Sequence, residues 1–116
     1  MFRLTTLAAV TIAIGSTSPA WSHSKKEGTT PADGTTVQAV EAIEMRFDKP
    51  MRIIAVTVKT AGDDVAIERE TGMEPVTEFR AVPAETLAPG AYEVEWRGMS
   101  GDGHPMQGSF GFTVRE

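Results

Sequence analysis

Two histidines and one aspartate are the residues of this chain whose types and positions could do chemistry. His23 follows a small-x-small motif, Ala20-Trp21-Ser22, and cleavage there by signal peptidase would make it the first residue of the mature chain. His104 lies in the glycine-flanked segment SGDGHPMQG, two residues after Asp102. A free α-amine, two imidazoles and a carboxylate suit Cu(II), which favours tetragonal nitrogen and oxygen donors. The sequence therefore predicts a Cu(II) site at His23, Asp102 and His104, provided that the fold brings the two segments together.

The spacing of these residues has a metal interpretation and an ordinary one. An N-terminal histidine can chelate through its α-amine and Nδ1, and residues at i and i+2 of an extended segment point the same way. Flanking glycines relax the backbone so that Asp102 and His104 can converge. In the ordinary interpretation these two residues are a solvated polar pair, Asp102 starts a turn, and His23 is a plain residue near the terminus.

A second cleavage site gives a different copper chemistry. Ser18-Pro19-Ala20 also fits the small-x-small pattern, and cutting there leaves Trp21-Ser22-His23. A histidine in third position can wrap square-planar Cu(II) or Ni(II) with its own amides, without Asp102 or His104. Pro19 beside the scissile bond disfavours this cut. We therefore expect residues 1–22 to be the signal peptide and residues 23–116 to form one domain.

The composition supports export into a bacterial periplasm. Arg3 precedes an uncharged apolar run, Leu4 to Gly15, which is shorter than the roughly 20 residues needed to span a bilayer. The chain has no cysteine, so its fold must rest on packing without disulfides. Removing residues 1–22 takes away one arginine and no carboxylate, which changes the formal charge from −5 to −6. This acidic balance disfavours nucleic acid and anionic membranes as partners, and we expect no membrane insertion of the mature chain.

Short alternating runs must position these residues. No amphipathic helix is evident; apolar residues recur at every second position, and turn residues separate the runs. Seven such strands in about 90 residues predict an all-β, immunoglobulin-like Greek-key β-sandwich. The expected inward faces are Ile43/Met45/Phe47, Ile54/Val56/Val58, Val65/Ile67, part of 76–82, Tyr92/Val94/Trp96 and Phe110/Phe112/Val114, after a first strand around residues 27–36.

The strand count predicts where the two copper segments lie. Seven strands running alternately up and down place the start of the chain and the loop 98–108 at the same end of the sandwich. His23 and the Asp102–His104 segment are therefore expected to be neighbours. The segment Leu87-Ala88-Pro89-Gly90-Ala91-Tyr92 is also typical of a tyrosine corner, although Tyr92 as a plain core aromatic is the alternative.

Four segments carry a family resemblance. They are His23 with Thr30-Pro31-Ala32-Asp33-Gly34, the turn Phe47-Asp48-Lys49-Pro50, the run Leu87-x-Pro89-Gly90-x-Tyr92-x-Val94-x-Trp96-Arg97, and Ser100-Gly101-Asp102-Gly103-His104-Pro105 with Gly108-Ser109-Phe110. In these segments, the last two above all, the chain resembles the CopC-type periplasmic copper-binding (copper resistance) proteins. The resemblance implies a β-sandwich that holds Cu(II) through an N-terminal histidine and the aspartate and histidine of the final loop. Those roles match His23, Asp102 and His104.

The methionines depart from part of this pattern. Some relatives carry a methionine-rich loop that binds Cu(I), whereas the stretch between the third and fifth expected strands here offers only Met73. Met45 has core spacing, Met51 follows a turn, and Met99 and Met106 flank the histidine loop. Packing is the expected role of each, and a separate Cu(I) site is not predicted.

The leading functional hypothesis is a non-enzymatic periplasmic protein that sequesters or delivers Cu(II) in copper homeostasis or resistance. A copper-dependent oxidative enzyme of histidine-brace type is the second hypothesis, but it needs an open coordination position and a flat aromatic face. The third is a metal-free immunoglobulin-like module that docks on a membrane partner. The resemblance implies a CopD-type inner-membrane copper protein as that partner, and a Cu(II) spectrum at one equivalent separates binding from the metal-free module.

Overall fold

The computed structural model describes residues 26–116, which form eight β-strands and no helix. The described residues accordingly contain no helical segment able to cross a membrane. The expected signal peptide, both cleavage sites and His23 lie outside them. The strands are β1 (Lys26–Thr30), β2 (Thr35–Val37), β3 (Ile43–Thr60), β4 (Asp63–Val65), β5 (Ile67–Arg69), β6 (Val76–Pro83), β7 (Gly90–Ser100) and β8 (Pro105–Val114). The prediction of an all-β sandwich is confirmed.

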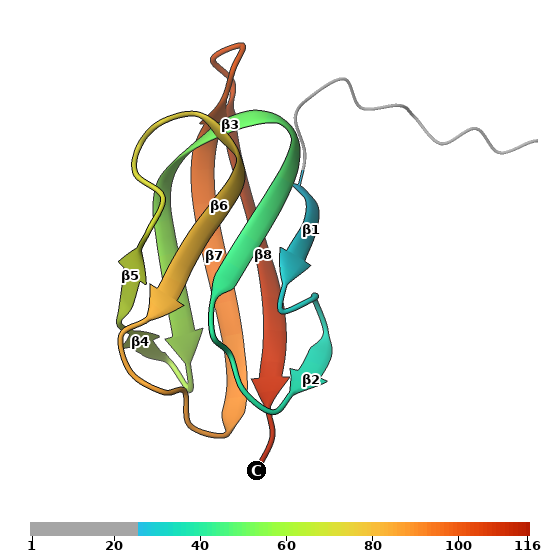
Figure 1. Ribbon diagram of the computed structural model, residues 1–116, viewed down its shortest axis with the longest axis vertical. Coiled ribbons are helices and arrows are strands. Elements are labelled where there is room, and N and C mark those ends of the chain that lie inside the picture. The colour runs from blue at the N-terminus through green and yellow to red at the C-terminus, as the bar shows by residue number, and fades with distance from the viewer. Residues whose placement is uncertain (1–25) are drawn as a thin grey trace, which may run out of the picture.

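Strand β3 belongs to both layers of the sandwich, because it arches over one end of the molecule (Figure 1). Its first part, from Ile43, pairs with β1 and β6, Met51 is paired with both β6 and β7, and the rest of the strand pairs with β7 and then β4. The bend between them falls at three exposed residues, 48–50. Strands β1, β6 and β5 complete one layer, and β4, β7, β8 and β2 complete the other. The turn expected at these residues is thus a bend within one continuous strand.

The core consists of the inward residues of β3, β6, β7 and β8. Trp96 packs edge-on against Phe47 with ring centroids 5.4 Å apart, and Tyr92 stacks on Phe112 at the same separation. Burying a large apolar side chain contributes about 1.5–3 kcal/mol, so this set dominates stability. The alternation predicted for the first run of β3 and for the last two strands is confirmed. Fully buried members are Ile43, Met45, Met51, Ile53, Val58, Phe79, Val94 and Phe110.

The inward face predicted for the second run of β3 is wrong at Ile54. Ile53 is fully buried, whereas 39% of Ile54 is exposed. The register with β7 shifts between Ile53 and Ala55, so one extra residue enters the strand. Beyond this bulge the alternation of inward and outward residues again matches the prediction, and Val58 is buried. A strict alternation rule cannot locate such an insertion.

Two other runs are divided differently from the prediction. The first strand expected around 27–36 is two strands, because a turn at Pro31 to Gly34 separates β1 on β3 from β2, which pairs in parallel with β8. The run containing Val65 and Ile67 is also two strands. Val65 ends β4 in one layer and Ile67 begins β5 in the other, so this short segment crosses between layers.

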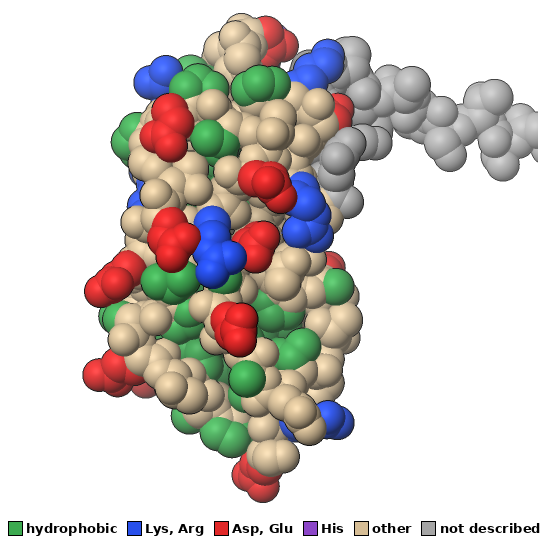
Figure 2. Space-filling view, in the orientation of Figure 1, with side chains coloured by type: hydrophobic (Ala, Val, Ile, Leu, Met, Phe, Trp, Pro, Cys, Tyr) green, Lys and Arg blue, Asp and Glu red, His purple; other side chains and the backbone are tan. Residues whose placement is uncertain are grey.

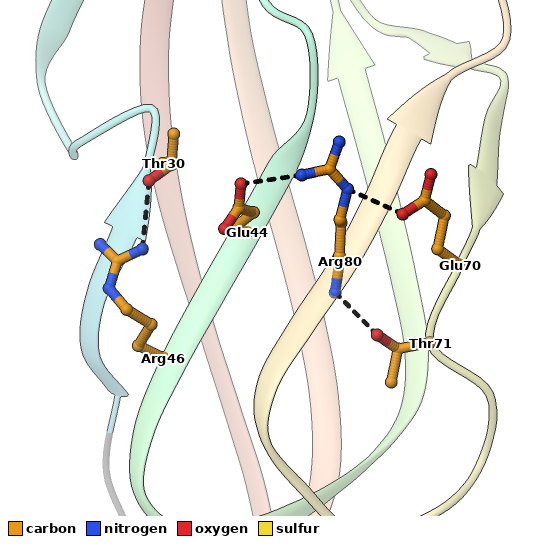
Figure 3. Close-up of polar contacts among 6 residues, drawn as sticks. All are labelled: Thr30, Glu44, Arg46, Glu70, Thr71 and Arg80. Carbon is orange, nitrogen blue, oxygen red and sulfur yellow. Dashed lines mark hydrogen bonds and ion pairs between the residues drawn. The ribbon is translucent and has the colours of Figure 1, made fainter.

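Arg80 on β6 connects β3 with the segment that follows β5 on the surface (Figure 3). Its guanidinium pairs with Glu44 at 3.2 Å and with Glu70 at 2.7 Å, and its backbone N–H donates to Thr71 Oγ1 at 3.0 Å. Figure 2 shows the same interspersion of acidic and basic side chains across the middle of this face. Exposed pairs of this kind contribute little each. The fold is held by its core.

The tyrosine corner is present, and it gives a stability prediction. The Tyr92 hydroxyl donates to the Ala88 carbonyl at 2.5 Å, four residues upstream. Tyr92→Phe keeps the ring stacked on Phe112 and removes only this bond, so we expect the free energy of unfolding to fall by about 1 kcal/mol. Urea denaturation followed by the fluorescence of Trp96 measures it. An unchanged midpoint would mean that the corner makes no net contribution.

Candidate metal centre

Asp102 and His104 lie in the tight turn between β7 and β8, which projects beyond the arch of β3 (Figure 1). The hairpin ladder ends at the pair Met99–Pro105. Beyond it, the Ser100 N–H donates to the His104 carbonyl and the Gly103 N–H donates to the Ser100 carbonyl, both at 2.9 Å. Gly103 has a φ of 86°, a conformation that glycine adopts at no steric cost. The turn is therefore closed by its own backbone.

The turn brings the two predicted ligands into direct contact. His104 Nδ1 lies 2.8 Å from Asp102 Oδ2, and both side chains are more than half exposed. A hydrogen on Nδ1 directed at the carboxylate leaves the lone pair that can bind a metal on Nε2. An ionised carboxylate has about four lone-pair sites, so Asp102 retains acceptor capacity for a cation. The structure thus places Asp102 and His104 side by side, as both the metal interpretation and the solvated polar pair require, and their role as ligands stays a prediction.

Ser100 holds Asp102 in place and lowers the pKa of its carboxyl group. The Ser100 hydroxyl donates to Asp102 Oδ1, and the His104 N–H donates back to Ser100 Oγ at 3.2 Å. Hydrogen bonding from Ser100, followed by that from His104, lowers the pKa of Asp102 from 3.8 to about 2. The turn thus presents a fixed negative charge beside an imidazole at every physiological pH.

The sequence analysis assigned no role to Ser100, although the alternation of inward and outward residues along β7 indicates one. Even-numbered residues of β7 point inward, and Ser100 continues that series as one of two buried polar residues among residues 28–116. A serine where the pattern requires an apolar residue indicates a hydroxyl that is needed for bonding. Here it bonds to the turn that follows.

Ser100→Ala is expected to increase the local opening of the turn clearly while lowering the free energy of unfolding of the whole domain only slightly. The change removes a hydrogen bond to Asp102 and the acceptor for the His104 N–H. We expect the free energy of unfolding to fall by about 1 kcal/mol and amide hydrogen exchange at His104 to speed up several-fold. Tyr92→Phe is the control, because it removes a comparable hydroxyl bond elsewhere. Equal His104 exchange in both variants would contradict this role of Ser100.

The first described strand begins at the same end of the sandwich as the Asp102–His104 turn. Lys26 is paired with Phe47 on one side of the β3 bend, and Ser100 is paired with Met51 on the other side. Figure 1 shows β1 entering from this end. His23 itself lies outside the described residues, three positions before Lys26, and three residues reach about 10 Å at most.

Among His, Cys, Asp and Glu side chains, the turn itself contributes Asp102 and His104. Within residues 26–116, no three His, Cys, Asp or Glu side chains are grouped so that they could hold a metal ion. A metal bound by Asp102 and His104 therefore needs further donors from elsewhere. Nitrogen donors beside one carboxylate and one imidazole would complete the set that Cu(II) favours.

Comparison with known proteins gives a consistent result. The model of the CopC domain family matches residues 26–115. Copper resistance protein C of Escherichia coli is 30% identical over 83% of this chain and 84% of its own length. Copper resistance protein C of Pseudomonas syringae pv. tomato is 31% identical over 83% of each chain.

Solved structures show the same architecture. PcoC, a methionine-rich copper resistance protein from Escherichia coli, superposes with a TM-score of 0.68 and 27% identity, covering 81% of this chain and all of that one. CopC from Methylosinus trichosporium OB3b gives a TM-score of 0.68 with 26% identity over 80% of this chain and 94% of its own.

Proposed function

Because the chain belongs to the CopC domain family, we propose that it is a periplasmic protein that binds copper as Cu(II) and sequesters or delivers it. The ligands in this proposal are His23, through its α-amine and imidazole, together with Asp102 and His104. The observation that carries it is the 2.8 Å contact between Asp102 and His104 on an exposed turn. The names of the relatives, copper resistance protein C, support the choice of metal.

The chemistry of the described donors supports the oxidation state. Asp102 is an ionised carboxylate with a pKa of about 2, and His104 offers an imidazole. Hard oxygen and imidazole nitrogen donors suit Cu(II), whereas thiolate or thioether sulfur suits Cu(I). The carboxylate also offsets part of the charge of the dication. These residues would hold the ion at the tip of the hairpin.

The position of Lys26 supports His23 as the missing donor. It is paired beside the β3 bend, at the end of the sandwich that carries the turn. A chain cut after Ser22 would begin three residues before it, within about 10 Å along the backbone. We propose export and this cleavage as the steps that create the site.

Binding, and not catalysis, is the proposed role of the ion. An anionic oxygen donor favours the oxidised metal and fills a coordination position that an oxygen-activating enzyme must keep open. Release to a copper-accepting protein would then complete the function. A CopD-type protein of the inner membrane is the acceptor that the family resemblance suggests.

The test is made on the exported protein purified from cells. Its intact mass should correspond to a chain that begins at His23, and one equivalent of Cu(II) should give a tetragonal EPR signal. A mass larger by one tryptophan and one serine would indicate the Trp21 terminus, whose own amides bind Cu(II). In that case His104→Ala would leave the spectrum unchanged, and the proposed centre would be rejected.

A further inference from the structure

The exposed large hydrophobic residues of the described chain gather in one place. They are Ile54, Met73 and Met99, with 39%, 50% and 40% of their surfaces exposed. All three line a hollow of about 540 Å³, where the outer face of β3 and β7 meets the segment between β5 and β6. Ile54 points outward because of the bulge in β3 described above. Apolar side chains grouped on the surface of a small domain often mark an interaction site.

A second hollow extends this surface along the same sheet. It measures about 460 Å³ and shares Ile54 and Met99 with the first, adding Met106 of β8. The two hollows are neighbours that share Ile54 and Met99, and we call them together the tip groove, defined by Ile54, Met73, Met99 and Met106. Unbranched methionines suit such a surface because they adapt to different partners.

Two arginines are the charged residues that line the tip groove. Arg52 lines the first hollow and Arg97 the second, and no acidic residue lines either. Within residues 26–116 neither arginine takes part in an ion pair. The chain as a whole carries a formal charge of −5. The groove is therefore a basic, apolar region on an acidic protein, and its field favours an acidic partner.

The groove adjoins the Asp102–His104 turn. Ser100, Gly101 and Gly103 form the wall of the first hollow at that end. A partner seated in the groove would lie beside the proposed copper ligands. This connection rests on the proposed function; the charge and shape of the groove do not.

We propose that the tip groove docks an acidic segment of the protein that exchanges copper with this chain. The segment carries apolar side chains between carboxylates: the apolar groups fill the two hollows, and the carboxylates face Arg52 and Arg97. A second copy of this chain fits the groove less well, because two acidic copies repel one another.

Two synthetic peptides serve as probes in a titration of the exported protein followed by NMR. One has leucine and methionine between glutamates, and the other has lysines in place of the glutamates. We expect the glutamate peptide to bind about tenfold more tightly and to shift the signals of Ile54, Met73 and Met99. Arg52→Glu combined with Arg97→Glu should reverse the preference. Lys59→Glu, on β3 but outside the groove, is the matched control and should keep it.

Three results would overturn the docking proposal. They are equal affinity for both peptides, signal changes confined to other surfaces, and groove signals that shift with protein concentration alone, which would assign the groove to a second copy. Cu(II) EPR on the same variants keeps the two proposals separate. The double arginine variant should bind copper normally, whereas a wild-type protein that discriminates the peptides but binds no Cu(II) would reject the metal centre alone.

Discussion

Replacing His104 by alanine is expected to weaken Cu(II) binding by more than about a hundredfold. Losing only an outer-shell partner of a metal ligand typically costs 10- to 100-fold in affinity, and His104 is proposed to bind the ion itself. The variant also leaves Asp102 without the imidazole that lies 2.8 Å away. Competition against a chelator of known affinity measures the change, and Cu(II) EPR shows whether a nitrogen donor has been lost.

Two further proteins complete this experiment. Adding one residue before His23 moves the α-amine away from its imidazole and should cause a comparable loss. Gln107→Ala changes an exposed polar residue three positions after His104 and should leave the affinity within error. If both the His104 variant and the extended chain bind as the parent does, the proposed ligand set is wrong.

Cu(II) affinity should also fall on the order of a thousandfold or more between pH 8 and pH 5. An amine and an imidazole bind a metal only when they have lost their proton, so both kinds of donor bind copper more weakly as the pH falls. Protons therefore compete with copper for these donors more strongly as the pH is lowered. Asp102 adds nothing to this slope, because hydrogen bonds from Ser100 and His104 keep its pKa at about 2. Chelator competition at several pH values gives the profile.

Asp102→Asn is the matched control for the pH profile. It should lower the affinity at every pH, because an anionic donor is lost, while the steepness between pH 8 and pH 5 persists. A parent profile that is flat over this range would mean that the amine and the imidazoles do not bind the ion.

The Asp102 carboxylate also affects folding stability. Its pKa is lower in the folded than in the unfolded chain, so its contribution to the free energy of unfolding is present above about pH 4 and is lost as the pH falls toward 2.

The sequence predicted the fold well where alternation is regular and less well where the chain changes layer. Tyr92, Val94 and Trp96 are all buried, as a period of two requires. Ile54 was assigned to the wrong face because a bulge is a property of pairing with β7, which the sequence of β3 alone does not reveal. The crossing between Val65 and Ile67 was missed for the same reason, since strands this short are defined by their neighbours.

The candidate site was also predicted only in part from the sequence. The spacing of Asp102 and His104 in a glycine-flanked turn allowed them to converge, and they lie 2.8 Å apart, while their role as metal ligands stays a prediction. The role of Ser100 depends on its burial at the end of β7, which the motif alone does not show. His23 lies outside the described residues and stays a prediction.

The hairpin tip separates the proposed metal donors from the residues that pack the core. Its last ladder pair is Met99–Pro105, and the proposed donors follow that pair on a turn closed by local bonds. Substitutions of Asp102 and His104 are therefore expected to leave strand pairing and the buried core unchanged, although they remove the local bonds of the turn. If the proposed donors bind the metal, exchanging them in this turn would alter the metal preference while the scaffold stays constant.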